Sequence, residues 1–163
     1  MKTTIYRYAM RAAGLLILLG LFNWFVIARP LGYQAAEIAG YLSMILALSM
    51  IFFAIRHFRA QYGNGSVSFG QGFRIGILIT LITSGVFYVY TTLYFTIWGD
   101  DFKAWADTHF RTTMPTEQYQ EFAMQMEQPL YSSALFQGLI MFLTVFFIGL
   151  IITLISATVL KKS

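Results

Sequence analysis

Four long apolar stretches, almost free of charged residues, constrain this chain more than any other feature. They cover residues 9–28, 35–55, 72–98 and 134–160. A helix needs about 20 mostly apolar residues to cross a bilayer, and each stretch meets that length. The sequence therefore predicts an all-α integral membrane protein with four transmembrane helices, arranged as one domain over residues 1–163.

The composition supports this interpretation. Only 11% of the 163 residues are charged and 58% are hydrophobic, whereas a soluble domain carries about 25% charged residues. Such a chain has too few charges to cover a water-facing surface, so most of its surface is expected to face lipid. The absence of cysteine excludes disulfides, thiol chemistry and metal sites with cysteine ligands.

Charge is distributed unevenly between the segments that connect these stretches. If the N-terminus lies inside, the inner segments carry only basic residues: Lys2, Arg7, Arg11, Arg56, Arg59, Arg74, Lys161 and Lys162. The outer segments then carry all of the acidic residues and only three basic ones. Because basic loops stay on the cytoplasmic side, this bias predicts that both termini are inside. Trp24, Trp98 and Trp105 then fall near the outer interface, where indole rings are favoured.

The first stretch also has features of a secretory signal, since Lys2, Arg7 and Arg11 precede an apolar run. A cleavage site would require small residues after that run, and the sequence there is FVIARPLGY. We therefore expect a retained membrane helix.

Residues 63–76, GNGSVSFGQGFRIG, are rich in glycine and raise the question of phosphate binding. The segment has no lysine for a Walker A motif, and its glycine spacing differs from the dinucleotide fingerprint. Gly63, Asn64 and Gly65 instead favour a turn, since both residue types tolerate positive φ. Ser68 is expected to cap a helix that begins near Phe69.

Small residues on the predicted helices indicate how the helices pack. One face of the third stretch carries a small residue at every fourth position: Gly72, Gly76, Thr80 and Ser84. The second and fourth stretches contribute Gly40 and Gly149 to similar faces. Small residues let membrane helices approach closely, which drives association where the hydrophobic effect is absent. We expect a compact antiparallel four-helix bundle.

Two runs resemble the family known as domain of unknown function 4199, small bacterial integral membrane proteins. They are GYLSMILALSMIFFAIRHFRAQYGNGSVSFGQGFRIGILITLI and, after an acidic segment, IGLIITLISATVLKK. The resemblance covers nearly the whole chain. It implies about four membrane helices and a multi-pass location in the bacterial inner (plasma) membrane, and it supplies no catalytic residues.

The segment 99–133 is the longest part predicted to lie outside the bilayer. Apolar residues recur at helical spacing in two runs: Phe102, Trp105, His109 and Phe110, then Tyr119, Phe122, Ala123 and Met126. Pro115 and Glu117 mark the start of the second run. We expect two short amphipathic helices lying on the membrane or, alternatively, a hairpin that extends the third and fourth helices. The acidic residues match no metal-loop pattern, so no metal site is expected.

Four polar residues within or beside the apolar stretches form a candidate polar site: Glu37, Asn23, Tyr88 and Arg74. Charged groups in hydrocarbon are costly and often functional. Glu37 is expected to lie at the interface and could pair with Arg29 across the intervening turn. A hydrogen bond between helices and a place in a solute site explain Asn23 equally well.

These features favour a structural or accessory membrane protein that associates with itself or with another membrane protein. The alternative is a subunit of a small-solute transporter or channel, which requires a polar cavity near Glu37, Asn23 and the tyrosines around Tyr88. An enzyme is not expected, because the sequence contains neither a nucleophile motif nor a metal motif. No cofactor, nucleotide or nucleic acid is expected to bind, and the lipid bilayer is the one certain environment.

Overall fold

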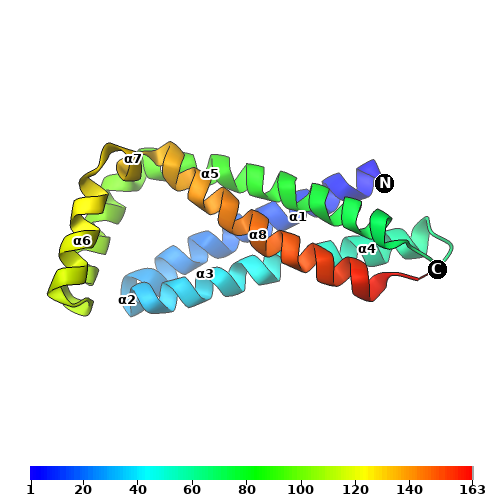
Figure 1. The fold of residues 1–163 in the computed structure, drawn as a ribbon, viewed down its shortest axis with the longest axis horizontal. Helices are drawn as coiled ribbons and strands as arrows, with labels where there is room; N and C mark the ends of the chain where they lie inside the picture. Colours follow the sequence, from blue (N-terminus) through cyan, green and yellow to red (C-terminus); the bar gives the residue numbers. More distant parts are fainter. Residues whose placement is uncertain (163) are drawn as a thin grey trace.

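Helices account for nearly all of residues 1–162, which the computed structural model describes (Figure 1). In chain order they are α1 (Lys2–Phe22), the π-helix η1 (Asn23–Ala28), α2 (Arg29–Leu31), α3 (Tyr33–Leu48), α4 (Met50–Gln61), α5 (Phe69–Thr113), α6 (Thr116–Glu127), α7 (Pro129–Ser132) and α8 (Ala134–Leu160). No β-strand occurs among these described residues.

Four helical stretches are long and apolar enough to cross a membrane, namely Lys2–Leu31, Tyr33–Gln61, Phe69–Thr113 and Ala134–Leu160. The predicted all-helical class with four candidate membrane-spanning helices is therefore confirmed. The fourth stretch has the predicted range of 134–160, and the other three helices extend beyond the predicted ranges.

The α5–α8 pair forms the most extensive contact between helices. The two helices run in opposite directions, because Gly72 at the start of α5 lies against Ala157 near the end of α8, whereas Thr80 further along α5 lies against Gly149. Helices α1 and α4 also pack against α5, and α4 contacts α8. Both chain termini lie at the same end of the molecule, beside the connection between α4 and α5 (Figure 1).

The core lies between these helices and is apolar. Its fully buried members come from all of the long helices: Ala9, Ala47, Leu48, Ile51, Ala54, Ile55, Ile75, Ile79 and Val145. Small residues in this set allow the backbones to approach, and the larger ones fill the remaining space. Many large apolar side chains face outward, such as Leu18, Leu42 and Phe147, as expected for a surface that contacts lipid.

The connection between α4 and α5 contains the predicted turn and cap. Asn64 and Gly65 have φ angles of 47° and 84°, in the region that Asn and Gly tolerate best. The Ser68 hydroxyl accepts a hydrogen bond from the Gln71 amide at 3.2 Å, and the Gln71 side chain accepts one from the Ser68 amide at 3.0 Å. This reciprocal capping box fixes the start of α5 and confirms the predicted role of Ser68.

The end of α8 is held against the same connection. Val67 and Lys162 exchange two backbone hydrogen bonds, of 3.1 and 3.0 Å. The Arg59 guanidinium donates a hydrogen bond to the Leu160 carbonyl at 3.3 Å. A cation at the C-terminal end of a helix also complements the helix dipole. These contacts tie α4, α8 and residue 67 together at the end of the molecule that carries the termini.

At the opposite end, α5 continues beyond its apolar part as far as Thr113 and bends at Trp98, whose φ and ψ of −120° and 15° are not helical. The first of the two expected amphipathic helices thus adjoins the third apolar helix directly across this kink, which matches the alternative expectation of an extension of that helix. The second is α6, which begins after Pro115 and has Glu117 in its first turn, as predicted. In Figure 1, α6 lies beside the far end of α5, across the direction of the long helices.

Candidate functional site

Gly76, Thr80, Gly149 and Thr153 form a reciprocal contact at the centre of the α5–α8 pair. A Cβ atom added at Gly76 would lie 2.5 Å from Cγ2 of Thr153, and one added at Gly149 would lie 2.5 Å from Cγ2 of Thr80. Each threonine therefore packs over the glycine of the other helix. The two threonine hydroxyls lie between these contacts, with their oxygen atoms 3.3 Å apart and fully buried. We call these four residues the Gly/Thr contact.

The remaining predicted residues on this face of α5 are also buried within the chain. A Cβ atom at Gly72 would lie 3.3 Å from Ala157 of α8. Ser84 is fully buried, and its hydroxyl has no hydrogen-bond partner among the described residues. The neighbouring Thr83 donates a hydrogen bond to the Ala9 carbonyl of α1 at 3.4 Å. The small-residue face of α5 is therefore buried, with α8 and α4 as the neighbours of its glycines, and is not exposed to another molecule.

Asn23 connects the first and second membrane-spanning stretches. Its Nδ2 atom donates a hydrogen bond to the Ala36 carbonyl at 2.8 Å, which is one of the two roles that the sequence left open. Gly40 lies one turn further along α3, where an added Cβ would be 3.6 Å from the same Nδ2 atom. Asn23 begins the π-helix η1, whose wider turn locally interrupts the α-helical hydrogen-bond ladder. The Asn23 Oδ1 atom is buried without a partner among the described residues.

The suggested ion pair between Glu37 and Arg29 does not form. Among residues 1–162 the structure contains one ion pair, and it joins Lys103 to Asp100. The Arg29 guanidinium instead lies over two aromatic rings of its own helix, 5.5 Å from the centroid of Trp24 and 5.2 Å from that of Phe25. Glu37 is exposed on α3.

The four residues of the candidate polar site are not brought together. Glu37 and Asn23 lie near the α2–α3 turn, whereas Arg74 is exposed near the opposite end of the molecule, in the second turn of α5. Tyr88 is half-buried on α5, and its ring lies next to Gly138 of α8. These residues therefore occupy separate environments and do not share one cavity.

Aromatic side chains cluster where α5 bends. The Trp24 ring of η1 has neighbours from both sides of the bend, with centroids 6.0 Å away at Tyr94, 5.9 Å at Phe102 and 5.3 Å at Trp105. One helical turn after Trp105, the His109 ring stacks on Trp105 at 5.4 Å. The cluster holds the continuation of α5 against the end of the first membrane-spanning stretch.

Gly32 lies between α2 and α3, and its contact with His109 holds the outer part of α5 in place. Gly32 has a φ of 87°, which L-residues rarely adopt, and a Cβ atom there would collide with the imidazole of His109. Glycine is therefore required at this position both for the turn and for the close approach of α5.

The outer part of α5 and α6 form a hairpin. The rings of Phe110 and Phe122 meet edge to face at 4.7 Å. The Tyr119 hydroxyl donates a hydrogen bond to Asp107 Oδ1, and the Arg111 guanidinium lies 5.7 Å from the centroid of the Tyr119 ring. The hydrogen bond to Asp107 is the main cause that raises the pKa of Tyr119 above 10.0, with a smaller opposing effect from Arg111.

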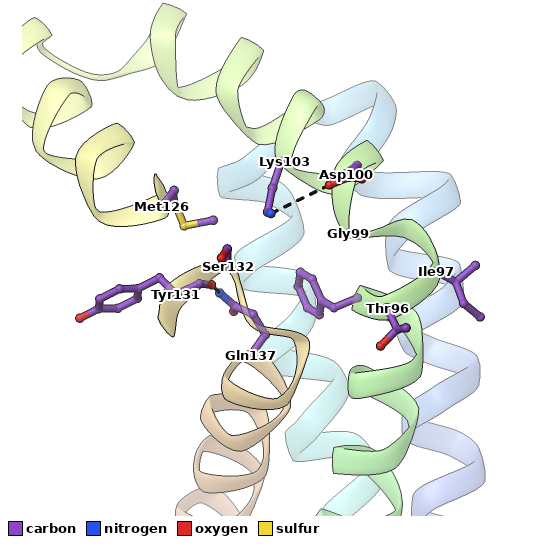
Figure 2. Close-up of a pocket in the computed structure, with 10 residues that line it drawn as sticks. Thr96, Ile97, Gly99, Asp100, Lys103, Met126, Tyr131, Ser132 and Gln137 are labelled. Carbon is purple, nitrogen blue, oxygen red and sulfur yellow. Dashed lines mark hydrogen bonds and ion pairs between the residues drawn. The ribbon is translucent and has the colours of Figure 1, made fainter. Parts of the chain in front are cut away.

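A polar cavity of about 140 Å³ lies between the bend of α5 and the start of α8 (Figure 2). Its lining combines residues of α5 with residues that follow α6: Phe95, Thr96, Ile97, Gly99, Asp100, Lys103, Met126, Tyr131, Ser132 and Gln137. In Figure 2 the Lys103 ammonium points from α5 toward Ser132, across the space between the two parts of the chain.

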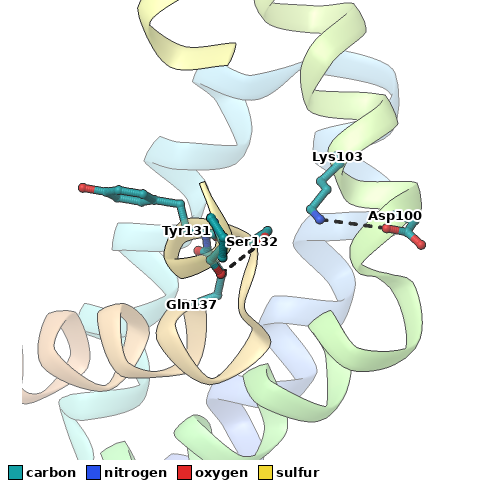
Figure 3. Close-up of polar contacts among 6 residues, drawn as sticks. Asp100, Lys103, Tyr131, Ser132 and Gln137 are labelled. Atoms are coloured by element: carbon teal, nitrogen blue, oxygen red, sulfur yellow. Dashed lines mark hydrogen bonds and ion pairs between the residues drawn. The ribbon is translucent and has the colours of Figure 1, made fainter. Parts of the chain in front are cut away.

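The polar contacts around this cavity leave part of its lining free (Figure 3). Lys103 Nζ lies 4.0 Å from an oxygen of Asp100, whose side chain is fully exposed. Gln137 uses its Nε2 atom to donate a hydrogen bond to the Tyr131 carbonyl at 2.8 Å, and the Ser132 hydroxyl donates one to the Pro129 carbonyl at 3.2 Å. An exposed ion pair contributes little to stability, so Lys103 remains available to a ligand.

An open apolar groove of about 530 Å³ lies on the surface of the α5–α8 pair. Several of its lining residues are neighbours in sequence of residues that line the polar cavity. Its lining includes Gly85 and Tyr88 of α5 and a ridge of α8 that contains Leu135, Leu139 and Phe142. Phe136 also lines the groove, and its ring meets that of the cavity residue Tyr131 edge to face at 5.3 Å.

Sequence reasoning did not identify Thr153 or the cavity residues Lys103 and Gln137. The sequence does contain a signal for Thr153, because the same pattern of a glycine followed four residues later by a threonine occurs on both helices. Residues 76–80 read GILIT and residues 149–153 read GLIIT. Lys103 and Gln137 carry no comparable signal, because they are isolated polar residues that only the bend of α5 brings to one cavity.

The acidic residues do not assemble into a metal site in the part of the chain that the structure describes, where no group of three or more potential ligands comes together. The acidic side chains of residues 100–127 are spread over α5 and α6 instead.

Comparison with known families gives one match, which covers residues 12–162, to the family described as "Protein of unknown function (DUF4199)". No curated protein and no solved structure matches the chain.

Proposed function

The chain belongs to the DUF4199 family over nearly its whole length, and we propose that it is a structural or accessory membrane protein that holds an acidic outer segment at the membrane surface for a partner. In this proposal the four candidate spans form an antiparallel bundle in the bacterial inner membrane, with both termini in the cytoplasm. The outer segment comprises residues 99–133. The protein is not an enzyme and needs no cofactor.

One observation carries the proposal: α5 runs from the packed core, across the bend at Trp98, into the outer segment. Its first half carries Gly76 and Thr80 of the Gly/Thr contact, and its last turns carry Asp107 and Phe110, which contact α6. The Trp24 ring contacts Tyr94 before the bend and Phe102 after it, which braces the two parts of α5 against each other. The bundle thereby fixes where α6 stands relative to the membrane.

The charge of the molecule supports the proposed orientation. All eight basic residues of the expected inner segments lie in α1, in the region around the α4–α5 connection, or at the end of α8. Six acidic and two basic residues lie in the outer segment. Positively charged segments are retained in the cytoplasm, so the outer segment would face the opposite side. Its acidic surface fits a partner with a basic surface.

A transporter or channel subunit is the second candidate, and the buried polar atoms without partners favour it. Among the described residues these include Asn23 Oδ1, Thr92 Oγ1 and Tyr94 Oη. Against it, the core members Ile51, Ile75 and Val145 are fully buried among other apolar residues. Neither the polar cavity nor the apolar groove is lined by Glu37 or Asn23.

Photocrosslinking in native membranes tests the accessory role. A photoreactive phenylalanine at exposed Gln118 of α6 is expected to capture a protein partner, and the same residue at Leu143 on the outward face of α8 is expected to capture lipid only. Charge reversal by Glu117→Lys together with Glu121→Lys should remove the adduct at residue 118. Protein adducts at residue 143 and none at residue 118 would overturn the proposal.

A further inference from the structure

Neighbouring residues of the one-turn helix α7, and the residue that follows it, line either the polar cavity or the apolar groove. Tyr131 and Ser132 line the cavity, whereas Leu130 and Ser133 line the groove. The contact between the rings of Tyr131 and Phe136 joins the two linings. A molecule with a polar head and an apolar tail could therefore occupy both spaces around this short segment.

The length of the groove fits the acyl chain of one leaflet. Along α8 its lining runs from Leu135 to Phe142, which is about 10 Å at a rise of about 1.5 Å per residue. One leaflet contributes about 15 Å of hydrocarbon to a bilayer. With Trp98 at the interface, the groove thus runs from the headgroup region toward the middle of the membrane.

The depth of the groove depends on Gly85, which has no side chain. A Cβ atom at Gly85 would find no other atom within 4 Å, so this glycine opens space and does not serve a helix contact. Gly76 and Gly149 differ from Gly85, because the threonines of the Gly/Thr contact fill the space beside them. Gly85 therefore has no packing role within the chain.

The charges at the cavity select the headgroup. Lys103 points into the cavity and offers an ammonium group to a phosphate, while Asp100, 4.0 Å from it, offers a carboxylate to a cation. The surrounding segment 99–133 is acidic, which disfavours a headgroup with net negative charge. A zwitterionic headgroup with one phosphate and one primary ammonium satisfies both residues.

We propose that the cavity and the groove together form a binding site for one phospholipid with a phosphoethanolamine headgroup. The phosphate lies at Lys103, the ammonium lies at Asp100, and one acyl chain lies along Gly85, Tyr88 and Leu139. This site is independent of the proposed accessory function, since it needs neither a protein partner nor a given orientation of the termini.

Native mass spectrometry of the full-length protein, released from vesicles with equal amounts of phosphatidylethanolamine and phosphatidylglycerol, tests the site. The unaltered protein should retain one phosphatidylethanolamine in preference to phosphatidylglycerol. Lys103→Gln removes a charge-assisted contact and should lower the retained fraction by about tenfold. Gly85→Leu should lower it as strongly, because the new side chain fills the floor of the groove.

Two matched variants control for general effects. Gly14→Leu changes an equally open glycine on α1, away from the groove, and Arg111→Gln removes a positive charge from α5 outside the cavity. Both should retain the lipid, and all four variants should unfold at similar temperatures. Equal retention of the two lipids by the unaltered protein, retention by Gly85→Leu at the normal level, or equal loss in Gly14→Leu would each overturn the proposal.

Discussion

Thr80 of α5 and Thr153 of α8 face each other with their hydroxyl oxygens 3.3 Å apart, and each side chain packs over a glycine of the opposite helix. The arrangement is nearly symmetric, because each helix contributes a glycine followed four residues later by a threonine. Close approach of the two backbones and a buried hydrogen bond thus occur at the same point. Both are interactions that hold helices together in lipid.

Gly76→Leu should destabilise the protein strongly. An added Cβ would lie 2.5 Å from Thr153 and 3.0 Å from Ile51, so α8 and α4 would have to move. Overpacking of this kind typically costs about 1–3 kcal/mol and occasionally more. Thermal unfolding in detergent measures the change, and Gly14→Leu, at an open glycine, serves as the control. Equal melting temperatures for the two variants would contradict the packing described for α5 and α8.

The hydroxyl pair itself can be measured by a double-mutant cycle. Thr80→Val and Thr153→Val keep the side-chain shape and remove one hydroxyl each. We expect a coupling free energy of about 0.6 kcal/mol, the average for hydrogen bonds between membrane helices. Unfolding in mixed micelles of the two single variants and the double variant gives this value. Strict additivity would mean that the two hydroxyls do not interact.

Gly32→Ala should loosen the outer part of α5. The φ of 87° is strained for alanine, and the methyl group would displace the His109 ring. Such strain costs about 1–3 kcal/mol. Hydrogen exchange of residues 99–113 should therefore accelerate, while that of the α5–α8 core should not. Adding His109→Ala removes the collision but not the backbone strain. The hydrogen-exchange rate of residues 99–113 in the double variant should therefore return only in part to that of the unaltered protein. An unchanged exchange rate in Gly32→Ala would refute this role of Gly32.

Tyr119 should ionise above its ordinary pKa of 10.0 because its hydroxyl donates a hydrogen bond to Asp107. A folded-state pKa that is raised stabilises the hairpin at pH values below the unfolded pKa, and this contribution is lost as the pH rises through the folded value. Carbon NMR of labelled tyrosine follows the titration, and Tyr119→Phe identifies the signal. Asp107→Ala should lower the pKa, since Arg111 then acts without the opposing hydrogen bond. A Tyr119 pKa at or below 10 in the unaltered protein would contradict the contact.

Local chemistry explains which parts of the fold could be predicted from the sequence. Ser68 caps α5 through atoms three residues away, and the bounds of α8 follow from its uninterrupted apolar run. A hydrogen bond of Asn23 to another helix was one of two roles that the sequence left open, and the structure shows it to α3. Each of these features depends on short stretches of chain.

Other features depend on how distant residues meet, and the sequence did not reveal them. Arg29 follows the π-helix and lies over the Trp24 ring of that helix, not beside Glu37. The non-helical φ and ψ of Trp98 bend α5 between its apolar part and the outer segment, and the sequence did not predict this bend. The cavity at Lys103 exists only because of that bend.

Cysteine labelling in intact cells tests the central claim most directly, since the natural chain has no cysteine. The claim is that the chain crosses a membrane with the α4–α5 connection and the outer segment on opposite sides. Ser66 and Gln118 are exposed in these two places. We predict that a membrane-impermeant maleimide labels Gln118→Cys in intact cells and Ser66→Cys only after permeabilisation. Equal labelling of both variants in intact cells, or labelling of Ser66→Cys alone, would contradict the account.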